Sequence, residues 1–182
     1  GKVTLTLEGV NEPIVISKLR LTPCESYRSY EDYREQYSGY GKGGDIVKIE
    51  AEYFNASSNQ TIYPISDTTS AANSPSATDR TLLNAVGGEK WQNVGQWIEY
   101  KFTVSKSGNY NIVARYKQNI LDGMATSRIL CLYSDATVAE GEDGYYNGVP
   151  FDEATRLKFN YSDDWQSGPL SDGVTDFEFY FK

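Results

Sequence analysis

Alternation of apolar and polar residues with a period of two is the feature that most constrains the fold of this chain. In the stretch 97–104 every second residue is apolar, namely Ile98, Tyr100, Phe102 and Val104. After a turn at 105–109, the stretch 110–117 places four such residues on one face: Tyr110, Ile112, Ala114 and Tyr116. Period-two patterns indicate half-buried β-strands, so we predict that these two stretches form a β-hairpin.

The same kind of pattern predicts strands at 3–7, 14–21, 46–54, 128–133, 156–161 and 174–181. The last of these has Phe177, Phe179 and Phe181 facing one way. Many short strands with turn-rich connections and one small helix indicate an all-β fold, a β-sandwich of jelly-roll type. We take residues 46–182 as the sandwich and residues 1–45 as an N-terminal annex of strands and a helix, packed on the same domain.

One segment of the annex predicts a helix. Ser29 and Asp32 resemble a capping box, and Tyr30, Tyr33 and Tyr37 recur at helical spacing. Because this helix is short, we expect it to pack on the flank of the sandwich.

Length and charge bound the class of protein. The 182 residues suit one domain, and the net charge of −8 argues against nucleic acid as a partner. The chain contains no apolar run of 18 residues or more, so we expect no membrane span. It begins at Gly1 without a basic and apolar leader, and we interpret it as part of a longer exported protein that works extracellularly or at the cell surface.

The two cysteines leave two interpretations open. Cys24 and Cys131 can form one disulfide, or they can be two buried thiols. Both lie in apolar neighbourhoods, which favours the buried thiols.

Catalysis finds little support in the sequence. The chain has no histidine, which removes the usual general base and most catalytic zinc sites. A glycosidase-type carboxylate pair has five acidic candidates, namely Glu99, Glu140, Glu142, Asp163 and Asp164. Acidic residues on turns are normally solvated, whereas catalytic pairs are buried with shifted pKa values, so we expect no enzymatic activity.

Glu50 and Glu52 are the most specific local feature. On the expected strand they project to the same face, about 7 Å apart. Such a pair either lies on a solvated face or shares a cation such as calcium, which prefers carboxylates and backbone carbonyls.

The order of several motifs resembles a known family. Glu50-Ala51-Glu52 is followed by the sequence GQWIEY at 95–100, SGNY at 107–110, ARY at 114–116 and TDFEF at 175–179. This order is similar to that of carbohydrate-binding modules of families six and thirty-five. The resemblance implies a structural calcium held by Glu50, Glu52 and Asp176. Gln96 replaces the common family Asp, and residues 134–148 are an insertion.

A second resemblance covers the annex as well. The segments 83–88, 116–119, 149–151 and 160–162, together with Trp91 and Trp165, resemble the sandwich domains fused to extracellular solute-binding proteins of bacterial sugar transporters. Those domains also carry a Tyr-rich helix like SYEDY at 29–33.

A sugar-binding site needs flat rings and convergent polar groups, because pyranose faces stack on aromatic rings while amides and guanidinium groups bind hydroxyls. Trp91 and Trp165 lie in polar, turn-rich sequence and serve either as stacking platforms or as loop anchors. Trp97 begins a strand and is left out of the site. The residues that we expect to line the site with the two tryptophans are Tyr63, Asn84, Gln118, Asn119 and Arg128.

Together these features predict a calcium-stabilised, non-catalytic module that binds a polysaccharide or oligosaccharide. Its partners in the same polypeptide would be enzyme or transporter domains. The alternative is a structural spacer or docking domain of a larger surface or solute-binding protein.

Overall fold

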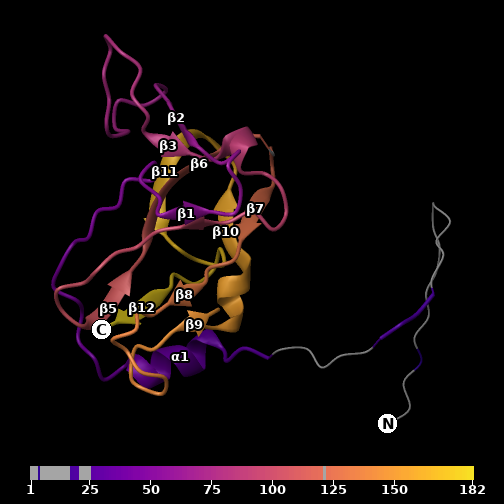
Figure 1. Cartoon of the computed structure of the whole chain (residues 1–182), viewed down its shortest axis with the longest axis vertical. Helices are drawn as coiled ribbons and strands as arrows, with labels where there is room; N and C mark the ends of the chain where they lie inside the picture. Colours follow the sequence, from indigo (N-terminus) through magenta and orange to yellow (C-terminus); the bar gives the residue numbers. More distant parts are fainter. Residues whose placement is uncertain (1–3, 5–16, 21–25, 121) are drawn as a thin grey trace.

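The computed structural model describes residues 4, 17–20, 26–120 and 122–182, and in this part the chain is mainly β, as predicted (Figure 1). This part contains three helical segments: α1 (Tyr30–Tyr37), η1 (Gly88–Lys90) and η2 (Asp152–Arg156). Its strands are β1 (Ala56–Ser57), β2 (Pro64–Ile65), β3 (Ala85–Val86), β4 (Ile98–Glu99), β5 (Gly108–Asn111), β6 (Val113–Gln118), β7 (Ala125–Arg128), β8 (Leu132–Tyr133), β9 (Asn147–Gly148), β10 (Leu157–Asn160), β11 (Ser162–Pro169) and β12 (Glu178–Phe181).

The strand pairs of the described residues are antiparallel, and most join distant parts of the sequence. β6 pairs with β11, β5 with β12, β7 with β10, β1 with β4, β2 with β3 and β8 with β9. The predicted hairpin between 97–104 and 110–117 is therefore wrong. Alternation identifies the buried face of a strand, but it does not identify the neighbour with which the strand pairs.

The strand expected at 46–54 is also wrong. Its centre is a turn, in which the amide of Tyr53 donates to the carbonyl of Glu50 at 3.1 Å. Ile46 is 98% exposed, so the apolar residues of this segment do not face a buried sheet. The stretch 97–104 contains only β4, whereas β6, β10 and β12 lie largely within predicted strands. The expected strand 3–7, apart from residue 4, lies outside the described residues, as do residues 14–16 and 21 of the expected strand 14–21. The described residues 17–20 form no strand.

The helix α1 begins as the sequence predicts. The hydroxyl of Ser29 accepts a hydrogen bond from the amide of Asp32 at 3.1 Å, and Glu31 and Asp32 add acidic side chains to the first turn. Such caps and charges stabilise a helix N-terminus. The helix then buries Tyr30, Tyr33 and Tyr37, as their spacing requires.

These tyrosines belong to the hydrophobic core and do more than cover its flank. Tyr33, Phe151, Phe177 and Phe179 are the largest fully buried side chains of the described residues. The ring of Phe151 contacts those of Tyr33, Phe177 and Phe179 at centroid distances of 5.1, 5.0 and 5.7 Å. On the other side of β12, Tyr180 stacks on Tyr37 at 4.8 Å. Both faces of β12 are thus buried among aromatic rings.

The hydroxyl groups of α1 complete the backbone hydrogen bonds of β12. One edge of this strand pairs with β5. On its other edge, the amides of Glu178 and Tyr180 donate to the hydroxyls of Tyr30 and Tyr33 at 2.9 and 2.8 Å. The Tyr33 hydroxyl contacts that of Tyr146, which donates to the carbonyl of Tyr180 at 2.8 Å. A closed circuit of hydrogen bonds therefore leaves and returns to the same residue of β12.

Burial keeps this circuit in one protonation state. It raises the pKa of Tyr33 to about 12, although the hydrogen bonds with Tyr146 and Tyr180 partly oppose that shift. Burial likewise raises the pKa of Tyr146. Both hydroxyls therefore remain proton donors throughout the neutral range.

Cys131 does not meet the expectation of a buried thiol. Its side chain is exposed, because it lies on the outward side of the backbone next to the buried Leu132. Cys24 lies outside the described residues.

Replacement of Tyr33 by Phe tests the hydroxyl circuit. The variant keeps the ring but leaves the buried amide of Tyr180 without its acceptor, and we expect a loss of about 1–3 kcal/mol in the free energy of unfolding, measured in urea. Tyr37→Phe is the matched control, because Tyr37 is equally buried while its hydroxyl makes no hydrogen bond to the described residues. Equal losses in both variants would show that the circuit contributes nothing.

Candidate functional site

Trp165 lies in an irregular part of the longest strand ladder. Between Ser162 and Gln166 the register of β11 against β6 shifts, and Trp165 falls within this shift. Such bulges redirect side chains out of the regular sheet. The half-buried indole is fixed by its Nε1–H, which donates to Oδ1 of Asp67 at 3.3 Å.

Asp67 connects this indole to a basic side chain. Its carboxylate accepts from Nζ of Lys117 at 3.2 Å, and the side chains of Asp67 and Lys117 are only 17% and 13% exposed. It also accepts from the amide of Thr69 at 2.8 Å and from the Thr69 hydroxyl. Burial alone would raise the pKa of Asp67, but the hydrogen bonds from Thr69, Trp165 and Lys117 outweigh it and lower the pKa to about 2.

Two cations flank the Trp165 ring. The guanidinium carbon of Arg115 lies 5.7 Å and Nζ of Lys117 lies 5.8 Å from the ring centroid. Arg115 and Lys117 are two residues apart on β6, so the strand projects both from the same face. The guanidinium group of Arg115 is held by the buried Asn73, whose Oδ1 accepts from Nε at 2.9 Å.

Asn84 positions the segment that carries Asp67. Its Oδ1 accepts from the amide of Asp67 at 2.8 Å, and its Nδ2 donates to the carbonyls of Asp67 and Pro75 at 2.9 and 3.0 Å. The side-chain amide is thus engaged with the protein backbone. Its place beside Asp67 makes Asn84 a positioning residue of this cluster.

Trp91 and Arg128 form a second cation–aromatic cluster. Trp91 follows η1 and is half-buried, with Nε1–H donating to the carbonyl of Gln96 at 3.1 Å. The guanidinium carbon of Arg128, at the end of β7, lies 4.8 Å from the centroid of the indole. Nη2 of Arg128 also donates to the Trp91 carbonyl at 3.3 Å.

The remaining residues that were predicted to bind sugar are Tyr63, Gln118 and Asn119. Tyr63 is 46% exposed, with Nζ of Lys90 from η1 lying 5.2 Å from its ring centroid. Gln118 is buried, and its side chain donates to the carbonyl of Met124 and accepts from the amide of Ile120, so it holds the segment after β6. Asn119 is exposed beside it.

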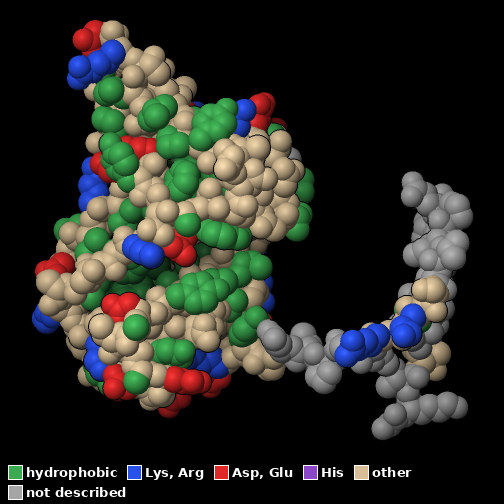
Figure 2. All heavy atoms as spheres, viewed as in Figure 1, with side chains coloured by type: hydrophobic (Ala, Val, Ile, Leu, Met, Phe, Trp, Pro, Cys, Tyr) green, Lys and Arg blue, Asp and Glu red, His purple; other side chains and the backbone are tan. Residues whose placement is uncertain are grey.

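The elements that carry these side chains gather at the end of the molecule opposite α1. Figure 1 draws β2, β3, η1, β7 and the ladder of β6 and β11 in this region. On the face shown in Figure 2, acidic side chains gather along the lower edge, where Figure 1 draws α1. We call the clusters around Trp91 and Trp165 the tryptophan end of the molecule.

The three residues expected to bind calcium, Glu50, Glu52 and Asp176, differ in burial and in their contacts. Glu52 is 6% exposed, and neither of its carboxylate oxygens has a hydrogen-bond partner in the described part of the chain. Glu50 forms an ion pair with Lys48 at 2.5 Å, and Asp176 is exposed. Within the described ranges no three His, Cys, Asp or Glu side chains are grouped so as to hold a metal ion.

The unpartnered carboxylate of Glu52 nevertheless fits a cation ligand, because a buried carboxylate without partners is costly. The side chain of Tyr100 lies near this carboxylate. Burial and the nearby charge of Glu52 raise the pKa of Tyr100 to about 12, and the Tyr100 hydroxyl donates to the carbonyl of Ala51 at 2.9 Å.

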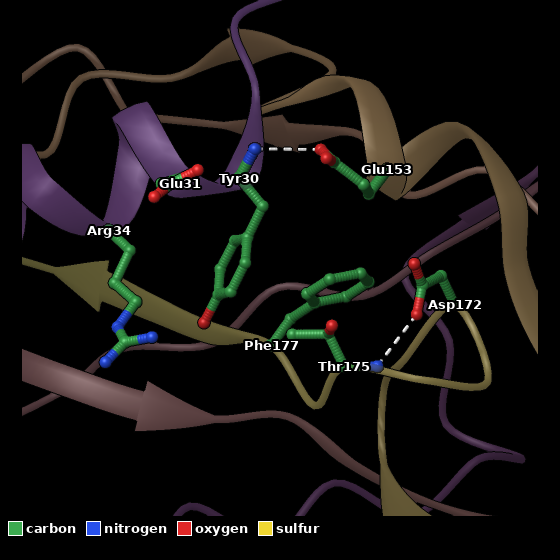
Figure 3. A pocket seen from close by; sticks show the side chains of 7 residues that line it. All are labelled: Tyr30, Glu31, Arg34, Glu153, Asp172, Thr175 and Phe177. Carbon is green, nitrogen blue, oxygen red and sulfur yellow. Dashed lines mark hydrogen bonds between the residues drawn. The ribbon is translucent and has the colours of Figure 1, made fainter.

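A separate pocket of about 270 Å³ lies beside the start of α1 (Figure 3). The rings of Tyr30 and Phe177 form part of its wall. Two of its acidic side chains are engaged with the backbone, because Glu153 accepts from the amide of Tyr30 and Asp172 from that of Thr175. None of the residues that were predicted to bind sugar or calcium lines this pocket.

Comparison with known proteins found no match among protein-family models, curated proteins or solved structures. Among the residues that the structure describes, no helix is long and apolar enough to cross a membrane.

Asp67, Arg115 and Lys117 are the residues of the tryptophan end that the sequence analysis missed. Arg115 and Lys117 carried a signal, since both lie on the polar face of a predicted strand, opposite its apolar residues. Asp67 carried none, because a single acidic residue in a Ser- and Thr-rich segment looks like any solvated loop residue.

Asp67 makes stability depend on pH in a defined window. Its pKa is about 2 in the folded chain and about 3.9 in an unfolded one, so its stabilising effect is complete above pH 4 and disappears as the pH falls toward 2. We expect the difference in unfolding free energy between the wild type and Asp67→Asn to shrink by about 2 kcal/mol between pH 5 and pH 2. Chemical denaturation at several pH values measures it, and a constant difference would contradict the assignment.

Proposed function

We propose that this chain is a non-catalytic carbohydrate-binding module that works outside the cell and captures a polysaccharide or oligosaccharide at its tryptophan end. In this proposal the antiparallel strand pairs close into a jelly-roll sandwich. The nonlocal pairing of β5 with β12 and of β6 with β11 supports that topology, because jelly rolls join strands that are distant in sequence.

The fixed indole of Trp165 is the observation that carries the proposal. Its Nε1–H is anchored by Asp67, while Lys117 and Arg115 lie beside the ring. A sugar needs this combination, since its C–H face stacks on an aromatic ring and its hydroxyls bind charged and amide groups. The anchoring reduces the conformational entropy that the side chain loses when a ligand stacks on it.

A site of this kind gives modest affinity, because only one or two rings contact the ligand. Attachment to an enzyme or transporter domain in the same polypeptide makes modest affinity sufficient, since tethering raises the effective concentration of the partner domain near its substrate.

Replacement of Trp165 by Ala tests the function. We expect binding to polysaccharide to weaken about tenfold or more, seen as lost retardation in affinity gels, while the far-ultraviolet circular dichroism spectrum stays unchanged. Trp91→Ala tests the second platform in the same way. Trp97→Ala is the matched control, because Trp97 is 49% exposed and lies outside the proposed site.

The alternative function, a spacer or docking domain, makes the opposite prediction. Retention of wild-type binding in both Trp91→Ala and Trp165→Ala would overturn the site. A broad array of oligosaccharides without any hit for the wild type would overturn carbohydrate binding and favour the spacer.

We further propose that calcium stabilises the fold through Glu52, whose two oxygens lack protein partners. Calcium accepts carboxylate and backbone carbonyl oxygens, so the other ligands need not be acidic. The family resemblance implies Glu50 and Asp176 as further ligands, but their side chains are not grouped with Glu52 in the described part of the chain, so this proposal rests on Glu52 alone.

A chelator tests the calcium proposal. At a calcium concentration a hundredfold above Kd, binding stabilises the native state by about 2.7 kcal/mol, so removal of calcium should lower the melting temperature of the wild type by several degrees. Glu52→Gln should melt at the same temperature with and without calcium. Glu142→Gln, which changes an exposed ion pair with Lys182, should respond to calcium as the wild type does. A wild-type midpoint that does not respond to chelator would count against the site.

A further inference from the structure

Cations are concentrated on the aromatic rings of the tryptophan end. Four of the six cation–aromatic contacts of the described residues involve Trp91, Trp165 or Tyr63. This concentration contrasts with the chain as a whole, whose net charge is −8. The sugar site is thus a locally basic region on an acidic protein.

The two arginines of this region have no acidic partner among the residues that the structure describes. Lys117 is neutralised by Asp67. Arg115 instead donates to the neutral side chains of Asn73, Ser70 and Ser167 at 2.9, 3.2 and 3.3 Å. Neither Arg115 nor Arg128 forms an ion pair with any residue that the structure describes.

Arg128 is the more confined of the two. It is half-buried, and its protein hydrogen bonds go to the carbonyls of Ser127 and Trp91 at 2.9 and 3.3 Å. Burial lowers the pKa of its guanidinium group, and no carboxylate of the described ranges pairs with it to offset that cost. Since arginine remains charged in proteins, an anionic group from a ligand would supply the missing compensation.

Guanidinium groups bind carboxylate and sulfate groups with paired hydrogen bonds, and they do so next to an aromatic ring as well as alone. The contact of Arg128 with the Trp91 ring therefore brings a cation and an aromatic ring together in one place. A sugar that carries an acidic group matches both.

We propose that the tryptophan end selects acidic sugars, with the ring face of the sugar on an indole and its carboxylate or sulfate group on Arg128 or Arg115. This inference rests on the proposed carbohydrate-binding function and defines its substrate class. The anionic substituent is either a carboxylate or a sulfate group, and binding to matched polysaccharides distinguishes the two.

Affinity electrophoresis with matched pairs of polysaccharides provides the test. Polygalacturonate and its fully methyl-esterified form differ in the free carboxylate, and carrageenan and agarose differ chiefly in sulfate. We expect the wild type to bind one acidic member at least about tenfold more tightly than its neutral counterpart. The pair that shows the difference identifies the substituent. Because the protein is itself acidic, retardation by a polyanion does not arise from its overall charge.

Arg128→Gln and Arg115→Gln locate the contact. We expect at least one of them to lose about tenfold in affinity for the acidic polysaccharide, with the difference between acidic and neutral forms reduced accordingly. Arg156→Gln is the control, because Arg156 lies on η2 in an exposed ion pair with Asp152. Circular dichroism confirms folding, and Arg115→Gln keeps the test valid if the half-buried Arg128 is needed for folding.

The outcomes separate this inference from the function on which it rests. Equal binding of the acidic and neutral members of both pairs would overturn selection of acidic sugars and leave carbohydrate binding intact. Wild-type affinity in both folded arginine variants would also overturn it. Failure of the wild type to bind any glycan would overturn both proposals.

Discussion

The hydrogen bonds between tyrosine hydroxyls and the backbone of β12 are the interaction on which the rest of the structure depends. β12 and the residue before it place Phe179 and Phe177 in the centre of the core, so the position of this strand determines where that core forms. Among the described strands, only β5 pairs with it, along one of its edges. Tyr30 and Tyr33 accept the amide protons on the opposite edge, and a buried amide without an acceptor would cost about 1–3 kcal/mol. The helix α1 therefore takes the place of a neighbouring strand.

This role explains the composition of the core. The chain has 15 tyrosines and one methionine. A Phe at position 33 would fill the same volume, but only Tyr fills that volume and also supplies an oxygen to the strand. Five tyrosines, namely Tyr30, Tyr33, Tyr37, Tyr146 and Tyr180, are buried in the core around α1. The proposed site uses Trp91 and Trp165, which are half-buried at the other end.

The two ends of the molecule are held together by different means. Around α1 the backbone is fixed by buried rings and hydroxyls. At the tryptophan end the strands β2 and β3 have two residues each, so side-chain amides do much of the positioning. Asn84 bonds the backbone at Asp67 and Pro75, and Gln118 bonds the backbone at Ile120 and Met124. A polar site can be built in this way because its side chains need fixed positions without a large apolar core beneath them.

The sequence allowed the helix and several strands to be predicted, because caps and alternation are local signals. Ser29 and the spacing of Tyr30, Tyr33 and Tyr37 define α1 without reference to any other segment. The partner of each strand was not predictable, since the alternation of 97–104 looks the same whether it pairs with 110–117 or with β1. In the candidate site, Trp91 and Arg128 were both predicted and do contact each other. Asp67 was not predicted as a site residue, because its role depends on contacts with Lys117 and Trp165, which are 50 and 98 residues away in the sequence.

The covered edge of β12 has a consequence for assembly. Exposed strand edges are templates on which a second chain can add a strand, and this is a common route to aggregation. Here the amides of Glu178 and Tyr180 are already bonded to side chains of the same molecule. Strand addition at this edge would first require α1 to detach and take its buried tyrosines out of the core. The aromatic helix therefore protects this edge of β12 from pairing with a strand of a neighbouring molecule.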